Sequence, residues 1–105
     1  MNIYHIINRE TWEEKTRNNL YHADSLDSEE FIHCCKKDQI TFVIDNWFQE
    51  QHGLLLITID AEKLKSPLIF EKSEGGLDPF PHIYGPVNLD AVTSIKKMED
   101  EDKNK

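Results

Sequence analysis

Short apolar runs separated by polar segments extend along most of this chain, and in most of them apolar and polar residues alternate. Such alternation is typical of β-strands, in which successive side chains point to opposite faces. In the first run, NIYHII at 2–7, Ile3, His5 and Ile7 share one face. The other runs predicted as short strands are FIHCC at 31–35, LIFE at 68–71, FPHIY at 80–84 and VTSIKKM at 92–98.

Two runs also indicate their place in a sheet. LLLITID at 54–60 is almost continuously apolar, which is typical of a central strand buried on both faces. FPHIY at 80–84 contains Pro81, which lacks a backbone N–H and is therefore favoured in an edge strand. We predict an edge strand at 80–84 that presents His82 and Tyr84 on one face.

One segment has clear helical spacing. Residues 37–52 carry five apolar side chains on one helical face, and Gly53 can take the left-handed conformation that ends a helix. The apolar side chains are Ile40, Val43, Ile44, Trp47 and Phe48.

A second, shorter helix is predicted at 9–19, with Thr11 and Glu14 as a capping box. The polar segment 20–30 predicts a loop, and Asn88 is placed to cap a short turn. Strands and helices do not alternate as they do in a doubly wound fold. The pattern therefore predicts the α+β class, with one long and one short helix.

Length and charge narrow the function classes. The 105 residues predict one domain over 1–98, followed by a charged, disordered tail at 99–105. A net charge of −8 argues against a nucleic-acid partner. There is no long apolar run for a membrane and no leader pattern at the N-terminus, so we expect a cytoplasmic protein, a monomer or weak dimer.

Three histidines occupy central positions in predicted apolar strands: His5, His33 and His82. A partly buried histidine forms hydrogen bonds, binds a ligand or transfers protons, so each is either a structural residue or part of a site. A zinc site with Cys34 is an alternative, but the spacing matches no known zinc motif, and we predict no metal site.

Glu71 ends the predicted strand LIFE. A carboxylate at a strand end can act as a general base or hold a ribose hydroxyl, or it can simply pair with a lysine in solvent. The chain lacks the strand–GxGxxG–helix context of a dinucleotide fingerprint, and it has no nucleophile elbow.

Taken in order, these motifs resemble one family. They are IYHI, a Trp-bearing helix, SL-x-x-E-x-FIH, Gln39 four residues beyond Cys35, a WF helix end, an LLL strand and E-x-S-x-GG-x-x-x-FPH-x-Y-x-P. The chain resembles the small bacterial family called domain of unknown function 952. The resemblance extends over roughly Asn2 to Ile95, and its most specific part is Glu71 to Pro86.

That family is thought to share the fold of ADP-ribosyltransferases, in which split, mostly antiparallel sheets enclose a cleft for NAD or a related nucleotide. The resemblance implies that His5 holds a ribose, His33 lines the nicotinamide pocket and Glu71 supports the transition state. The residues it implies are His33 and Glu71 for catalysis, and His5, His33, Gln39, His82 and Tyr84 for cofactor binding.

Two departures from the family pattern affect this site. Glu29–Glu30 stands where the family has an acidic residue followed by Gly, so a positive φ there would strain Glu30. Cys35 replaces a serine and donates hydrogen bonds more weakly.

Three functions remain open. The first is a nucleotide-binding domain, with or without ADP-ribosyltransferase-like chemistry on NAD. The second is a non-catalytic module that binds a small molecule or peptide through Phe80 and Tyr84. The third is a metal hydrolase that uses the histidines.

Overall fold

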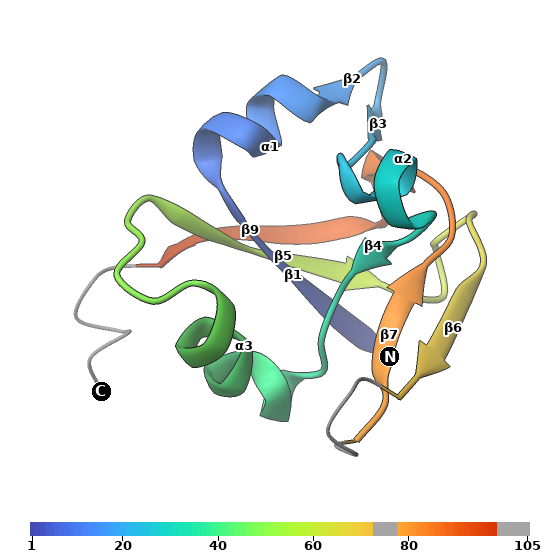
Figure 1. The fold of residues 1–105 in the computed structure, drawn as a ribbon. Coiled ribbons are helices and arrows are strands. Elements are labelled where there is room, and N and C mark those ends of the chain that lie inside the picture. Colours follow the sequence, from blue (N-terminus) through green and yellow to red (C-terminus); the bar gives the residue numbers. More distant parts are fainter. Residues whose placement is uncertain (73–77, 99–105) are drawn as a thin grey trace.

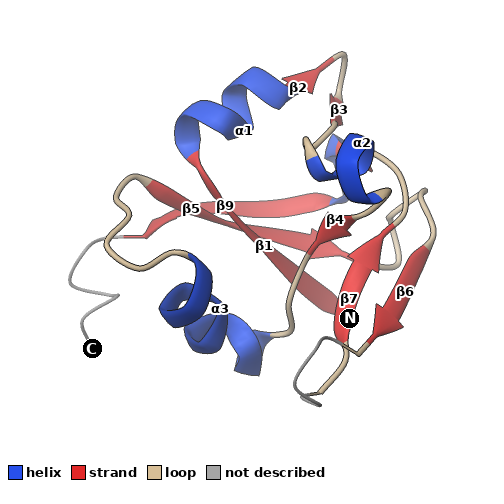
Figure 2. Cartoon of the chain, viewed as in Figure 1, coloured by secondary structure: helices blue, strands red, loops and turns tan. Residues whose placement is uncertain are grey.

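The computed structural model describes residues 1–72 and 78–98, which form nine strands, three α-helices and two 3₁₀ turns (Figures 1 and 2). The predicted tail at 99–105 lies outside the described residues. The strands are β1 (Asn2–Asn8), β2 (Thr16–Arg17), β3 (Leu20–Tyr21), β4 (Ile32–His33), β5 (Leu54–Asp60), β6 (Leu68–Glu71), β7 (Phe80–Ile83), β8 (Val87–Asn88) and β9 (Val92–Met98). The helical elements are α1 (Arg9–Lys15), α2 (Ser25–Glu29), η1 (Lys37–Gln39), α3 (Ile40–Trp47) and η2 (Leu89–Ala91).

The strands form three antiparallel sheets, ordered β1-β5-β9, β2-β3-β8 and β4-β7-β6, which confirms the α+β class. The first and third sheets are joined by a bridge between Tyr4 of β1 and Cys35, which follows β4. Tyr4 N–H donates to Cys35 O over 2.8 Å, and Cys35 N–H donates to Tyr4 O over 2.7 Å. This bridge joins the edge of β1 that faces away from β5 to the chain that leaves β4.

The predicted central strand 54–60 is confirmed, because β5 lies between β1 and β9 (Figure 1). Its Ile57 and Ile59 are essentially fully buried, as is Ile3 on the facing strand β1. Cys34 and Cys35 pack into different core clusters, as expected for neighbouring residues of an extended chain.

The prediction of one long helix over 37–52 was wrong. The segment divides into η1 and the eight-residue α3, which ends at Trp47. The backbone leaves the helix at Phe48 and takes a left-handed φ of +59° at Glu50, before the φ of +69° at Gly53. Among the described helices, none is long and apolar enough to cross a membrane.

The N-terminal helical region also differs from its prediction. α1 ends at Lys15, and the predicted loop 20–30 contains β3 and α2. The N-cap of α1 is Asn8, whose Oδ1 accepts a hydrogen bond from the Thr11 N–H over 2.8 Å, so the predicted Thr11–Glu14 capping box is replaced.

The prediction that 80–84 is an edge strand was also wrong, because β7 lies between β4 and β6. Pro81 is tolerated because its backbone N and O point to the side where β4 has already ended. Cys34 N–H donates to Pro81 O over 3.1 Å, and only the reciprocal bond is missing. The short β4 therefore permits a proline in a central strand.

Candidate functional site

The structure divides the predicted site residues between a pocket and the outer face of the β4-β7-β6 sheet. The pocket has a volume of about 500 Å³, and His5 and His33 are among the residues that line it. It lies where β1, α1, β3, α2, β4, α3 and β7 meet. Glu71, His82 and Tyr84 do not line it.

His5 is a wall residue of this pocket, and both of its ring nitrogens form hydrogen bonds. Nδ1 lies 2.6 Å from the backbone oxygen of His33, and Nε2 lies 2.7 Å from the hydroxyl of Tyr21. A carbonyl oxygen can only accept, so Nδ1 carries the proton and donates to His33 O. In the neutral ring Nε2 then accepts, and the Tyr21 hydroxyl donates to it.

Burial keeps this pair neutral. Desolvation lowers the pKa of His5 from 6.5 to about 4, against the opposing effect of its backbone hydrogen bond to His33. Burial also raises the pKa of Tyr21 well above its usual range. Trp12 packs on the Tyr21 ring with centroids 4.6 Å apart and fixes its orientation. The pocket wall therefore presents an uncharged imidazole–phenol pair.

The outer face of the sheet holds a second cluster, centred on Glu71. Its Oε1 accepts hydrogen bonds from Tyr84 OH over 2.6 Å and from His82 Nδ1 over 2.7 Å. These two donors lower the pKa of Glu71, and the bond to Glu71 raises the pKa of Tyr84. Phe31 stacks on His82 with ring centroids 4.0 Å apart. The interpretation of Glu71 as a lysine-paired strand end is replaced by this network.

His33 lies between the pocket and the Glu71 cluster. It is the cross-strand partner of His82, and their ring centroids are 5.4 Å apart. Its Nε2 donates to Glu29 Oε2 over 3.0 Å, and Glu29 also lines the pocket. His33 and Glu71, predicted together as catalytic residues, are thus connected through His82, which contacts His33 and donates to Glu71.

Gln39 lies apart from the pocket. Its side chain is buried, with Oε1 accepting from Lys36 N–H over 2.8 Å and Nε2 donating to Pro79 O over 3.1 Å. The amide therefore ties the start of η1 to the residues before β7. Among residues 1–72 and 78–98, no group of three or more His, Cys, Asp or Glu side chains is arranged to hold a metal ion.

Several pocket residues were not identified as site residues from the sequence, among them Tyr21, Glu29 and Trp47. Tyr21 and Glu29 lie in the segment predicted as a loop, where polar neighbours hide the two-residue strand β3. Trp47 matched the apolar stripe of the helix and was assigned to the core, yet the residue is 56% exposed. Only the structure shows that this large aromatic residue is exposed.

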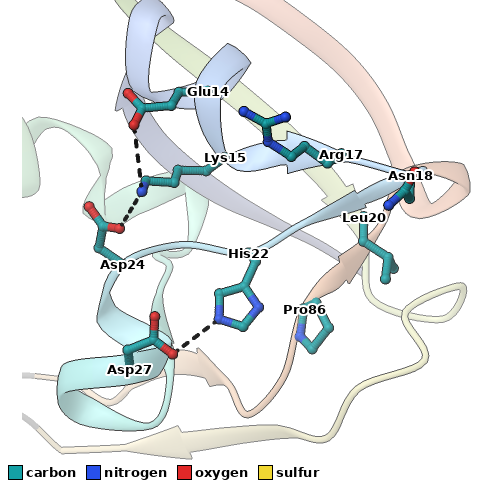
Figure 3. Close-up of a pocket in the computed structure, with 9 residues that line it drawn as sticks. All are labelled: Glu14, Lys15, Arg17, Asn18, Leu20, His22, Asp24, Asp27 and Pro86. Atoms are coloured by element: carbon teal, nitrogen blue, oxygen red, sulfur yellow. Dashed lines mark hydrogen bonds and ion pairs between the residues drawn. The ribbon is translucent and has the colours of Figure 1, made fainter.

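A smaller hollow of about 380 Å³ adjoins this pocket and shares Asp24 with it (Figure 3). Lys15 Nζ lies 2.9 Å from Asp24 Oδ1 and 3.7 Å from Glu14 Oε1. His22 Nε2 lies 3.4 Å from Asp27 Oδ1. Since these charged groups face one another, the larger pocket is the better candidate for a ligand.

The chain is similar to a family model and to solved structures. A family model described as Protein of unknown function (DUF952) matches residues 6–95. The crystal structure of protein CC0527 from Caulobacter crescentus is similar, with 30% identity and a TM-score of 0.79 over 90% of this chain and 83% of that one. Its solution NMR structure has 29% identity and a TM-score of 0.77 over 93% and 84%. No curated protein matches the chain.

Proposed function

The chain belongs to the family described as Protein of unknown function (DUF952), and within it we propose a domain that binds a small molecule, NAD or a related nucleotide, in the His5–Tyr21 pocket. The observation that carries this proposal is the buried neutral imidazole–phenol pair in the wall of an otherwise largely apolar pocket. Small-molecule sites typically combine apolar walls with a few placed polar groups in about 300–1,000 Å³.

The hydrogen bonds of the His5–Tyr21 pair indicate which hydrogen-bonding group a ligand needs. Tyr21 donates its hydroxyl proton to His5, so the free lone pair on the hydroxyl oxygen can only accept. A matching ligand therefore donates a hydrogen bond from a carboxamide N–H or a ribose hydroxyl. No lysine or arginine lines the pocket within the part of the chain that the structure describes. The nicotinamide riboside end of NAD fits this chemistry, and its phosphates would lie outside, toward solvent.

The pocket also supports the expected relation to the ADP-ribosyltransferase fold, since it lies between strands of separate antiparallel sheets. Glycosidic cleavage would need a carboxylate beside the ribose. Glu71, the carboxylate expected in that role, does not line the pocket, so we propose binding as the function and leave turnover outside the proposal.

The test is a thermal-shift titration of the protein with NAD and with ADP-ribose. A ligand that binds only the folded state stabilises it by RT ln(1 + [L]/Kd), so the melting midpoint rises with ligand concentration. We expect a shift with NAD that is strongly reduced in His33→Ala. His22→Ala is the matched control, because the side chain of His22 is similarly exposed, at 54% against 56%, but lines only the smaller hollow. The proposal would be contradicted by the absence of a thermal shift at millimolar NAD or ADP-ribose. It would also be contradicted by an equal reduction of the shift in His33→Ala and His22→Ala.

A further inference from the structure

We propose that the pocket selects a positively charged planar ring, with Glu29 as the counter-charge and Trp47 as the aromatic surface on which the ring lies. This inference rests on the proposed function and specifies the class of ligand. Two independent features support it: the sign of the charges that line the pocket, and the nature of its walls.

The charged side chains that line the pocket are all acidic. They are Asp24 and Glu29, while the neighbouring His5 ring is kept neutral by burial. Within the described residues, the lining contains no lysine or arginine that could neutralise an anion. The whole chain carries a net charge of −8, which adds to a negative potential at the pocket. A cation entering this space is attracted, and an anion is repelled.

Of the two carboxylates, Glu29 is the one available to a ligand. Asp24 is paired with the ammonium of Lys15, which lies between Asp24 and Glu14 in Figure 3. Glu29 instead accepts a hydrogen bond from an imidazole N–H of His33. That hydrogen bond is made to Oε2 of Glu29. Its side chain is half exposed, so it can reorient toward a ligand at the pocket mouth.

The walls suit a flat organic cation. Five aromatic side chains line the pocket: Tyr4, Tyr21, Trp47, Phe48 and Phe80. Trp47 is the most exposed of the large ones, and Phe42 and Phe80 hold it edge-on with ring centroids 5.6 Å and 6.4 Å away. Cations are attracted to aromatic faces, and indole gives the strongest attraction. Trp47 and Phe48 also bring the C-terminal end of α3 to the pocket, where helix carbonyls favour positive charge.

For NAD, the proposal predicts different affinities for the oxidised and the reduced form. The nicotinamide ring of oxidised NAD is a pyridinium cation, while that of the reduced form is a neutral dihydropyridine. The phosphates are the same in both, so a difference in affinity reports on the ring alone. The pocket should therefore prefer the oxidised form.

The decisive experiment uses three probes of nearly the same shape and different charge: the 1-methylnicotinamide cation, neutral nicotinamide and the nicotinate anion. Binding to the full chain is measured by calorimetry and by the shift of ligand-proximal amide signals in NMR. We expect the cation to bind about tenfold more tightly than nicotinamide, and nicotinate to bind most weakly.

Two variants test which residues cause the preference for the cation. Glu29→Gln should remove most of the cation's advantage while nicotinamide binding stays within about twofold, because only a charge is lost. Trp47→Leu should weaken the cation more than nicotinamide. Glu10→Gln, on the exposed side of α1, is the matched loss of one negative charge and should leave the ratio unchanged.

The outcomes separate this inference from the proposed function. Equal binding of the cation and nicotinamide, with amide shifts at the pocket, would overturn charge selection and leave the small-molecule pocket standing. A thermal shift with NAD but no binding of any of the three probes would overturn the inference, because the ring would then lie elsewhere. The absence of both would overturn the inference together with the proposed function.

Discussion

At the residue scale, the most informative backbone position is Glu30, which follows α2 with φ +73° and ψ +2°. A left-handed conformation costs a residue with a Cβ about 1–2 kcal/mol, and glycine avoids this cost. The sequence indicated strain here, because a glutamate occupies a place where the family has glycine. The structure confirms the positive φ.

We therefore expect Glu30→Gly to stabilise the fold by about 0.5–1 kcal/mol, since relief of the backbone strain exceeds the added entropy of the unfolded chain. Urea unfolding followed by Trp fluorescence measures the change. Ser28→Gly is the control: Ser28 lies inside α2, and its replacement by glycine should cost about 0.5–1 kcal/mol. Equal destabilisation by both substitutions would show that Glu30 is not strained.

At the scale of elements, Asn88 performs a different task from the expected turn cap. Its side chain makes no cap bond to the backbone of η2, although Nδ2 donates to Asp90 Oδ1. Instead Oδ1 accepts from Lys65 N–H over 2.9 Å, and Nδ2 donates to Lys63 O over 2.9 Å. One buried amide in β8 thus holds the segment between β5 and β6 in place.

Asn88→Ala should destabilise the protein by about 1–3 kcal/mol, because it leaves the backbone groups of Lys65 and Lys63 without partners. Chemical unfolding measures the loss, with Asn46→Ala as control. Asn46 bonds only Phe42 O and is exposed, so its truncation should change stability by about 0.5 kcal/mol or less. A cost for Asn88→Ala as small as that of the control would refute the bridging role.

The elements also show why the sequence predicted some features and missed others. Strands β1, β5, β6 and β9 were predicted with nearly correct bounds, because short runs rich in apolar and β-branched residues favour strands. The central place of β7 depends on pairing between His33 and His82, far apart in the chain, and local rules about proline gave the wrong answer. Tyr21 was missed for the same reason, since its role comes from its contact with His5.

At the scale of the whole molecule, stability should depend on pH through His5. Its folded pKa of about 4 lies below the unfolded value of 6.5, so between these values only the unfolded chain takes up the proton. This contribution to stability is complete above pH 6.5 and is lost as the pH falls toward 4. From about pH 7.5 to about pH 5 the loss amounts to about 2 kcal/mol.

The measurement is urea unfolding at both pH values for the wild type and for His5→Asn, which removes the titrating group. The carboxylates titrate in both proteins, so the difference between their pH dependences isolates His5. We expect the variant to lose about 2 kcal/mol less than the wild type over this range. Identical pH dependences would show that His5 is not held neutral by burial.

The position of β5 between the first and last strands also governs how fast the chain can fold. Asn2 pairs with Asp60, and Leu54 pairs with Met98, so both neighbours of β5 arrive from distant parts of the sequence. Long loops must close before these strand pairings stabilise the chain. We therefore expect refolding in about milliseconds to seconds. Until β9 docks, β5 exposes a row of unpaired amides beside its apolar face. During that interval, a second unfolded chain competes with β9 for the same edge.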